Sequence, residues 1–198
     1  MLDEAHLVDR LPVADRDLLS RLSRYFDNLE NRLREGEGWF IFNAKRDRSA
    51  RLVRYIVGQL AGFRPLISSY HLAWRDFALH AYVMEVEMAG WIQTAAAPSM
   101  DQHIEQEHRI ANQVAQGTNY HLMSTDVLVL SGIVPTQPHE VTYLDKVVAT
   151  RYSRRFPSIL ITPLLPHELE ERFRVSPGGG EIWQRFFDRM YQTSLMAL

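Results

Sequence analysis

The sequence predicts an α/β fold in which helices cover both faces of a parallel sheet. Segments 126–130 and 158–162 are almost wholly apolar and rich in branched side chains. Such runs are typical of strands that are buried on both faces of a parallel sheet. Around them lie segments whose apolar residues recur at helical spacing. Strands and helices that alternate in this way indicate a three-layer architecture.

Each element carries a local signal of its own. The helices show apolar residues three and four positions apart, the strands are short apolar or aromatic runs, and glycine or proline ends them. The expected helices span 14–34, 49–60, 74–88, 101–117, 139–152, 167–174 and 181–198. The expected strands span 39–42, 66–71, 126–130 and 158–162. Polar connections are expected at 43–48, 94–100 and 176–180.

Length and composition exclude several classes of protein. The 198 residues fit one domain, 1–198. The chain has no cysteine, so disulfides and cysteine-ligated zinc are excluded, and its net charge of −2 does not indicate a nucleic-acid or membrane binder. No apolar run approaches the roughly 20 residues of a membrane-spanning helix, and the polar N-terminus is unlike a secretory signal. We expect a cytoplasmic protein without a membrane partner.

Four segments occur in an order that resembles one ATPase family. A helix leads to Gly36 and Gly38, an aromatic strand and a further helix follow, and DVLVL comes later. RRFPSILITPLLPHELEERF and IWQRFFDRMYQTS complete the series. Together they resemble the DnaC/IstB-type AAA+ ATPases, which are bacterial helicase loaders and insertion-sequence ATP-binding proteins. The resemblance covers about 20–195, with a leading helix within 1–35 and an unmatched insert at 84–120. It implies a P-loop NTPase-like AAA+ core without a lid domain.

The segment that corresponds to the phosphate loop of this family departs from its motif, G-x-x-x-x-G-K-[ST]. The loop would span 43–50, with Asn43 and Arg48 at the two glycine positions. Ser49 replaces the lysine that reaches the phosphates, and Ala50 replaces the hydroxyl that holds Mg²⁺. The glycines matter because they let backbone N–H groups wrap around the phosphates.

Two further motifs of the resembling family are altered. Ser131 and Gly132 stand where the acidic pair that handles Mg²⁺ and water would follow the strand. Pro163 stands at the polar sensor position, and proline has no N–H to donate. With loop, acid and sensor changed together, no residue is left to stabilise a transition state. We therefore expect no catalytic residue, no cofactor and no metal, that is, a pseudo-ATPase.

Arginines supply the remaining candidates. Arg189 matches the arginine-finger position of the resembling family. Two basic clusters are candidates for contact with a nucleic acid or a partner: Arg46, Arg48 and Arg51 near the former loop, and Arg151, Arg154 and Arg155 before a strand. A solvated surface without a specific role is an alternative for each of them.

Three hypotheses of function stay open. The first, implied by the resemblance, is an inactive loader-like domain in DNA replication or a mobile element. It would bind a protein partner, which could be a helicase, an initiator or an AAA+ homologue. Assembly into a homo-oligomer is an open alternative within this hypothesis. The second is a nucleic-acid-binding module that uses the arginine clusters on DNA. The third is a nucleotide switch with an altered pocket. An ordinary α/β domain that never bound nucleotide is the simplest alternative.

Overall fold

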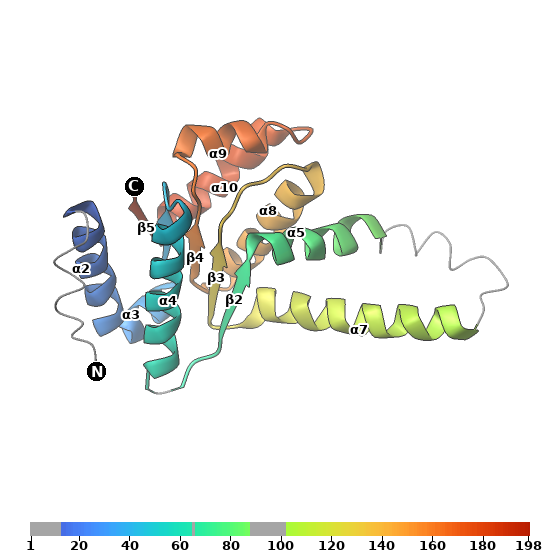
Figure 1. Ribbon diagram of the computed structural model, residues 1–198, viewed down its shortest axis with the longest axis horizontal. Helices are drawn as coiled ribbons and strands as arrows, with labels where there is room; N and C mark the ends of the chain where they lie inside the picture. Colours follow the sequence, from blue (N-terminus) through green and yellow to red (C-terminus); the bar gives the residue numbers. More distant parts are fainter. Residues whose placement is uncertain (1–12, 65, 88–101) are drawn as a thin grey trace.

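Five parallel strands form one sheet in the computed structural model of the chain, in the order β2-β3-β4-β1-β5 (Figure 1). The structure describes residues 13–64, 66–87 and 102–198, with side chains from residue 15 in the first range and from residue 113 in the last. The strands are β1 (Gly38–Ile41), β2 (Ser69–Ala73), β3 (Val127–Ser131), β4 (Ser158–Ile161) and β5 (Ser194–Ala197). In register, Trp39 lies beside Ile159 of β4 and Leu195 of β5.

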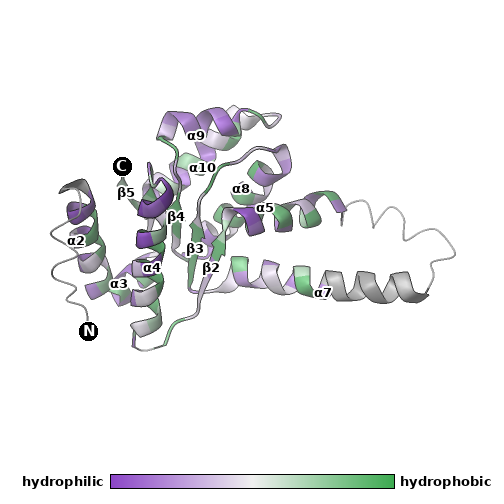
Figure 2. Ribbon diagram, in the orientation of Figure 1, coloured by the Kyte–Doolittle hydropathy of each residue, from purple (hydrophilic) through white to green (hydrophobic). Residues whose placement is uncertain are grey.

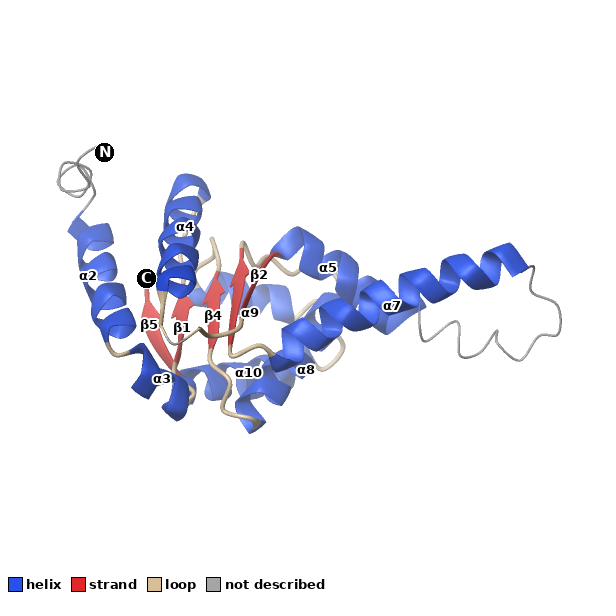
Figure 3. Ribbon diagram, turned by 90° about the horizontal axis from the view of Figure 1, so that it is seen from below, coloured by secondary structure: helices blue, strands red, loops and turns tan. Residues whose placement is uncertain are grey.

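Helices cover both faces of this sheet, as the sequence predicts. One face packs on α2 (Val13–Asp27), α3 (Leu29–Glu35) and α4 (Arg46–Gly62). The other packs on α5 (Trp74–Tyr82), α7 (Gln102–Ser124), α8 (Pro138–Ser153), α9 (Pro166–Phe173) and α10 (Gly179–Thr193). A π-helical turn, η1 (Val83–Glu87), continues α5. Figure 3 shows α4 on one side of the strands and α10 on the other.

The alternation of side chains along β1 explains the two cores. Trp39 and Ile41 point into the core formed with α2 and α4, whereas Phe40 and Phe42 point into the core formed with α8 and α10. All four are at most 2% exposed. The strand is therefore buried at every position. In Figure 2, β3 appears green while much of α9 is purple.

Gly36 and Gly38, where the chain enters β1, are required by close backbone contacts. Gly36 has φ +72° and ends α3 in the left-handed conformation, which glycine adopts without steric cost. A Cβ on Gly38 would lie 2.0 Å from the carbonyl oxygen of Ser158 on the neighbouring strand. The Gly-x-Gly pattern therefore reflects how the chain enters the sheet.

Several expected elements differ in their bounds from those in the structure. The strand expected over 66–71 is β2, Ser69–Ala73. The helix expected over 181–198 ends at Thr193, and Ser194–Ala197 form β5 beside β1. The helix expected from 49 begins at Arg46, inside the expected polar turn. The helix expected over 14–34 is two helices that meet at Asn28.

The remaining expectations fall around the insert. The loop expected at 94–100 lies outside the described residues, while α7 runs on to Ser124, past the expected end of its helix. The α5 and α7 ribbons extend from one edge of the sheet (Figure 3). Within the described ranges, no helix is both long and apolar enough to cross a bilayer.

Candidate functional site

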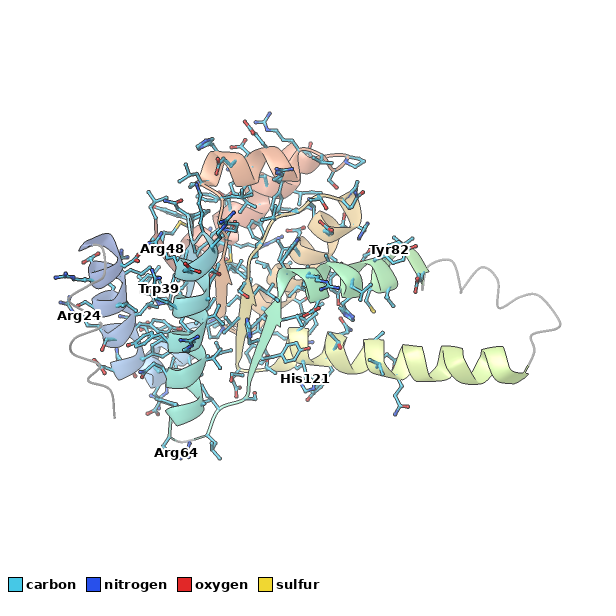
Figure 4. All side chains as sticks on the ribbon, viewed as in Figure 1. Arg24, Trp39, Arg48, Arg64, Tyr82 and His121 are labelled. Carbon is cyan, nitrogen blue, oxygen red and sulfur yellow. The ribbon has the colours of Figure 1, made fainter. Side chains whose placement is uncertain are left out.

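The segment between β1 and α4 occupies the place of the expected phosphate loop, at the carboxyl ends of the strands. Asn43 and Arg46 have positive φ angles of 52° and 37°, so this turn uses left-handed backbone without glycine. Figure 4 labels Arg48 near the N-terminal end of α4. Ser49 and Ala50 lie within this helix. The second half of the expected loop of 43–50 therefore forms the first turn of α4.

Four backbone N–H groups of this turn donate to protein carbonyls. The N–H of Asn43 donates to Leu164 O (3.0 Å), and that of Ala44 to Thr162 O (2.9 Å). The N–H groups of Lys45 and Arg48 donate within the turn itself. A phosphate-binding loop needs such groups free and aimed at the anion. Here the first two are directed into the sheet's own carboxyl edge.

The Arg48 side chain fills the space beside this turn. Its Nη1 donates to the carbonyls of Phe42 and Asn43 (3.4 and 3.0 Å), and its Nη2 donates to Leu198 O (3.1 Å). Its Nε lies 2.7 Å from Oδ1 of Asp15, and both side chains are at most 15% exposed. The turn therefore presents carbonyl oxygens to a cation, the opposite polarity to a phosphate loop.

Asp15 connects α2 to the start of α4. Besides Arg48, its carboxylate pairs with Arg51 at 3.1 Å. Arg48 and Arg51 are thus engaged within the chain, whereas Arg46 is exposed. The first basic cluster is not a single open patch, and sequence reasoning missed Asp15 because its partners lie more than thirty positions away.

Neutral hydroxyl groups occupy the ends of β3 and β4. Ser131 Oγ lies 3.0 Å from Nε2 of His71 on the adjacent strand β2. Thr162 Oγ1 donates to Ile133 O (2.7 Å) and accepts from the N–H of Leu164 (3.1 Å). Gly132 follows Ser131 with φ +75°. The His71–Ser131 pair was not expected from the sequence, where the two residues are 60 positions apart.

No acidic side chain follows β3 directly, since β3 ends at Ser131 and Gly132 comes next. Pro163, at the expected sensor position, lies two residues after β4. Asp126 lies at the opposite end of β3, where its carboxylate accepts from the N–H and hydroxyl of Ser68 (2.7 Å each). Among the described residues no group of three or more potential metal ligands converges.

Arg189 is held by its own chain. Its Nη1 donates to Asp145 Oδ1 at 2.6 Å, and Arg185 pairs with the other carboxylate oxygen at 2.8 Å. Asp145 is 7% exposed on α8, so this acid anchors α10. A role for Arg189 as a finger toward another subunit would require this ion pair to break.

The second basic cluster is divided by burial. Arg151 is 0% exposed, and its guanidinium donates to Ser158 Oγ and to the carbonyls of Leu122, Asp126 and Pro157. Burial lowers its pKa to about 10. The expectation that Arg151 contacts a nucleic acid or partner is wrong, because it joins α7, α8 and the strands from inside. Arg154 and Arg155 are exposed.

Comparison with known proteins identifies the fold. In sequence, the chain matches no protein-family model and no curated protein. In structure, it is similar to the DnaC helicase loader, with a TM-score of 0.62 and 14% identity over 94% of this chain and 90% of that chain.

Two structures of DnaA are also similar. The replication initiator DnaA bound to AMPPCP and single-stranded DNA has a TM-score of 0.61 and 12% identity over all of this chain, and AMPPCP-bound DnaA from Aquifex aeolicus has 0.55 and 12% over 94%. The chain spans 51% and 47% of those two chains. It therefore has the AAA+ P-loop NTPase fold of DnaC and DnaA.

Proposed function

We propose that this protein is a catalytically inactive AAA+ domain that acts by binding a protein partner in DNA replication or a mobile element. One observation supports the proposal that the domain is catalytically inactive. The turn after β1 directs the N–H groups of Asn43 and Ala44 into the protein and places two carbonyl oxygens against the Arg48 guanidinium. An ATP phosphate would meet lone pairs where it needs donors, so binding would be unfavourable.

The proposal that the domain binds a protein partner rests on the similarity of its fold to other proteins. The similar structures are a helicase loader and a replication initiator. Fold alone does not assign function, so a helicase, an initiator or an AAA+ homologue is the partner class to be tested.

Thermal unfolding with and without Mg-ATP tests the inactive site. A ligand at one hundred times its Kd adds about 2.7 kcal/mol to stability. For a chain of this size that would raise Tm by roughly 5–10 °C. We expect no shift with millimolar Mg-ATP beyond that produced by Mg-pyrophosphate, the control. A saturable shift specific to ATP would overturn the proposal and favour a nucleotide switch.

Co-elution with the purified replicative helicase of the source organism tests the partner. We expect a complex that persists without nucleotide, because the proposal requires no ATP. Complex formation only with ATP would contradict the inactive site, and no complex with helicase, initiator or AAA+ homologue would contradict the partner role.

A second candidate function is nucleic-acid binding, and a backbone outlier favours it. Arg155 has φ +56° where α8 ends, with its N–H bonded to Tyr152 O and that of Phe156 to Arg151 O. Glycine normally occupies this position, and an L-residue costs about 1 kcal/mol more. An exposed arginine kept at such a position, next to Arg154, is the basis for proposing a phosphate contact.

Fluorescence anisotropy with a single-stranded oligonucleotide tests this candidate. Arg155→Gly should raise the unfolding free energy by about 1 kcal/mol while the affinity falls. The salt dependence should weaken by about one counterion per arginine removed from the pair. Arg24→Ala, exposed on α2 (Figure 4), is the matched control. Unchanged affinity in Arg154→Ala/Arg155→Gly, or no binding at low salt, would remove the candidate.

A further inference from the structure

A serine and a histidine lie within hydrogen-bond distance of each other on β3 and β2. Ser131 is the last residue of β3, and its Oγ lies 3.0 Å from Nε2 of His71 on β2. Among the described residues, His71 is the sole hydrogen-bond partner of this hydroxyl. A hydroxyl within reach of an imidazole nitrogen is the arrangement that activates a serine as a nucleophile.

The imidazole of His71 is in the protonation state that a general base needs. Although the residue is exposed overall, partial burial of its ring lowers the pKa of His71 below the ordinary value of 6.5. The ring is therefore neutral at pH 7. With its proton on Nδ1, it accepts the proton of Ser131 at Nε2. The other tautomer would leave the serine proton without an acceptor in the part of the chain that the structure describes.

The surroundings of this pair leave room for a substrate. β2 is the last strand on its side of the sheet, so no described strand covers His71 (Figure 1). Among the described residues, a Cβ added to Gly132 would meet only Trp74 Cβ, at 4.0 Å, apart from its neighbours in the chain. Because Ser131 is 9% exposed, a carbonyl group would have to approach its Oγ through this open space beside Gly132.

The backbone next to the serine supplies a free donor. The N–H of Gly132 has no acceptor within the described ranges, and it is the next N–H, that of Ile133, that donates to Ile161 O on β4 (3.1 Å). In α/β-hydrolases, the N–H of the residue after the nucleophile stabilises the oxyanion of the tetrahedral intermediate. The Gly132 N–H is therefore available to a negative charge that develops beside Ser131.

We propose that Ser131 and His71 form a dyad that hydrolyses small carboxylic esters. Ser131 Oγ bonds to the carbonyl carbon of the ester while His71 Nε2 takes its proton. The bond between this carbon and the alcohol oxygen then breaks, and His71 gives the proton to the leaving oxygen, so that an acyl-Ser131 remains. A water molecule bonds to the acyl carbon as His71 takes its proton, the bond to Oγ breaks, and Oγ recovers the proton as the carboxylic acid leaves.

The dyad is expected to be slow. No carboxylate contacts the ring of His71 in the described part of the chain, so the imidazolium that forms lacks the acidic partner of a full triad. We therefore expect the acyl-Ser131 to form faster than it is hydrolysed. The inference goes beyond the proposed function and does not depend on it, since it uses no residue of the turn after β1 and concerns a reaction other than ATP hydrolysis.

Labelling of the full chain with a fluorophosphonate, followed by peptide mass spectrometry, tests the dyad. Such a probe forms a covalent bond with serines that are activated as nucleophiles. We expect the label on Ser131, at a rate that falls at least about a hundredfold in His71→Gln, because glutamine can hydrogen-bond the hydroxyl but supplies no base. A chain without label on Ser131 overturns the proposal, and so does a labelling rate that is unchanged in His71→Gln.

Release of nitrophenol from p-nitrophenyl acetate gives a second measurement. We expect an initial burst of about one nitrophenol per chain, followed by slow turnover, with no burst in Ser131→Ala. His167→Ala, at an exposed histidine on α9, is the matched control and should keep both the burst and the label. Tm is measured for every variant. A hydrogen bond that only joins β2 to β3 would lower Tm in Ser131→Ala while the wild type showed neither burst nor label, and that result would contradict the dyad.

Discussion

Single residues at the strand ends decide what this fold can bind. Arg48 is the clearest case, since one side chain contacts β1, the backbone oxygen of Leu198 and α2 through Asp15. The resemblance places Arg48 at a glycine position of the phosphate-loop motif, which stays a prediction. Its partners cannot be predicted from the sequence, because they are set by strands and helices distant along the chain.

Arg48→Ala should lower the free energy of unfolding by about 2 kcal/mol. The substitution leaves the Asp15 carboxylate without its nearest cation and removes donors from three carbonyls. Urea unfolding measures the change. Asp15→Ala should cost a similar amount, and the double variant should cost clearly less than the sum because the two act as one pair. Strict additivity would contradict the pairing.

Gly38→Ala should lower stability by about 2–3 kcal/mol or prevent folding, because the added Cβ meets the Ser158 backbone at 2.0 Å. Gly58→Ala is the matched control, since Gly58 lies within α4 with no atom within 4 Å of an added Cβ. That variant should gain up to about 1 kcal/mol from helix propensity. Thermal or urea melts compare the two, and an equal effect would contradict the close strand contact.

At the scale of elements, a buried polar network fastens α5 to its neighbours. His80 Nε2 lies 3.0 Å from the hydroxyl of Tyr143 on α8, and that hydroxyl donates to Asn119 Oδ1 of α7 at 2.8 Å. Because the tyrosine proton is used on Asn119, His80 donates from Nε2 as a neutral ring. Burial lowers the pKa of His80 to about 4.

This network predicts a loss of stability in mild acid. Unfolded His80 binds a proton near its ordinary pKa of 6.5, whereas folded His80 does so only near 4. Between these values the unfolded chain holds more protons, so the stability present above pH 6.5 falls by about 2–3 kcal/mol toward pH 4. Urea unfolding of the wild type and of His80→Phe isolates the effect, since other groups titrate in both. Parallel pH profiles would contradict it.

The elements also mark where sequence periodicity stops being informative. The strands β3 and β4 and the helices α8 and α9 are predictable because their patterns are local. β5 is not, because Ser194 follows the amphipathic α10 with no glycine or proline between them. Its strand conformation comes from pairing with β1, which is a contact across the whole chain. The burial of Arg151 cannot be predicted from the sequence for the same reason, since its hydrogen-bond acceptors lie on other segments of the chain.

For the whole molecule, the fold and a phosphate-binding turn depend on different features of the chain. The sheet order depends on apolar strands and close glycines, whereas phosphate binding depends on free N–H groups in one short turn. The first can persist when the second is lost. The chain is 14% identical to DnaC and has a similar structure over 94% of its length.

Restoring the motif residues tests this separation. In Asn43→Gly/Arg48→Gly/Ser49→Lys/Ala50→Thr, we expect no millimolar Mg-ATP binding by calorimetry, because α4 still begins at Arg46 and the N–H of Ala44 still donates to Thr162. The four replacements supply lysine and hydroxyl without the wrapped backbone that holds the phosphates. Arg48→Ala alone controls for removal of the arginine. Tight ATP binding by the fourfold variant would contradict this expectation. It would show that these four side chains, and not the backbone of the turn, prevent phosphate binding.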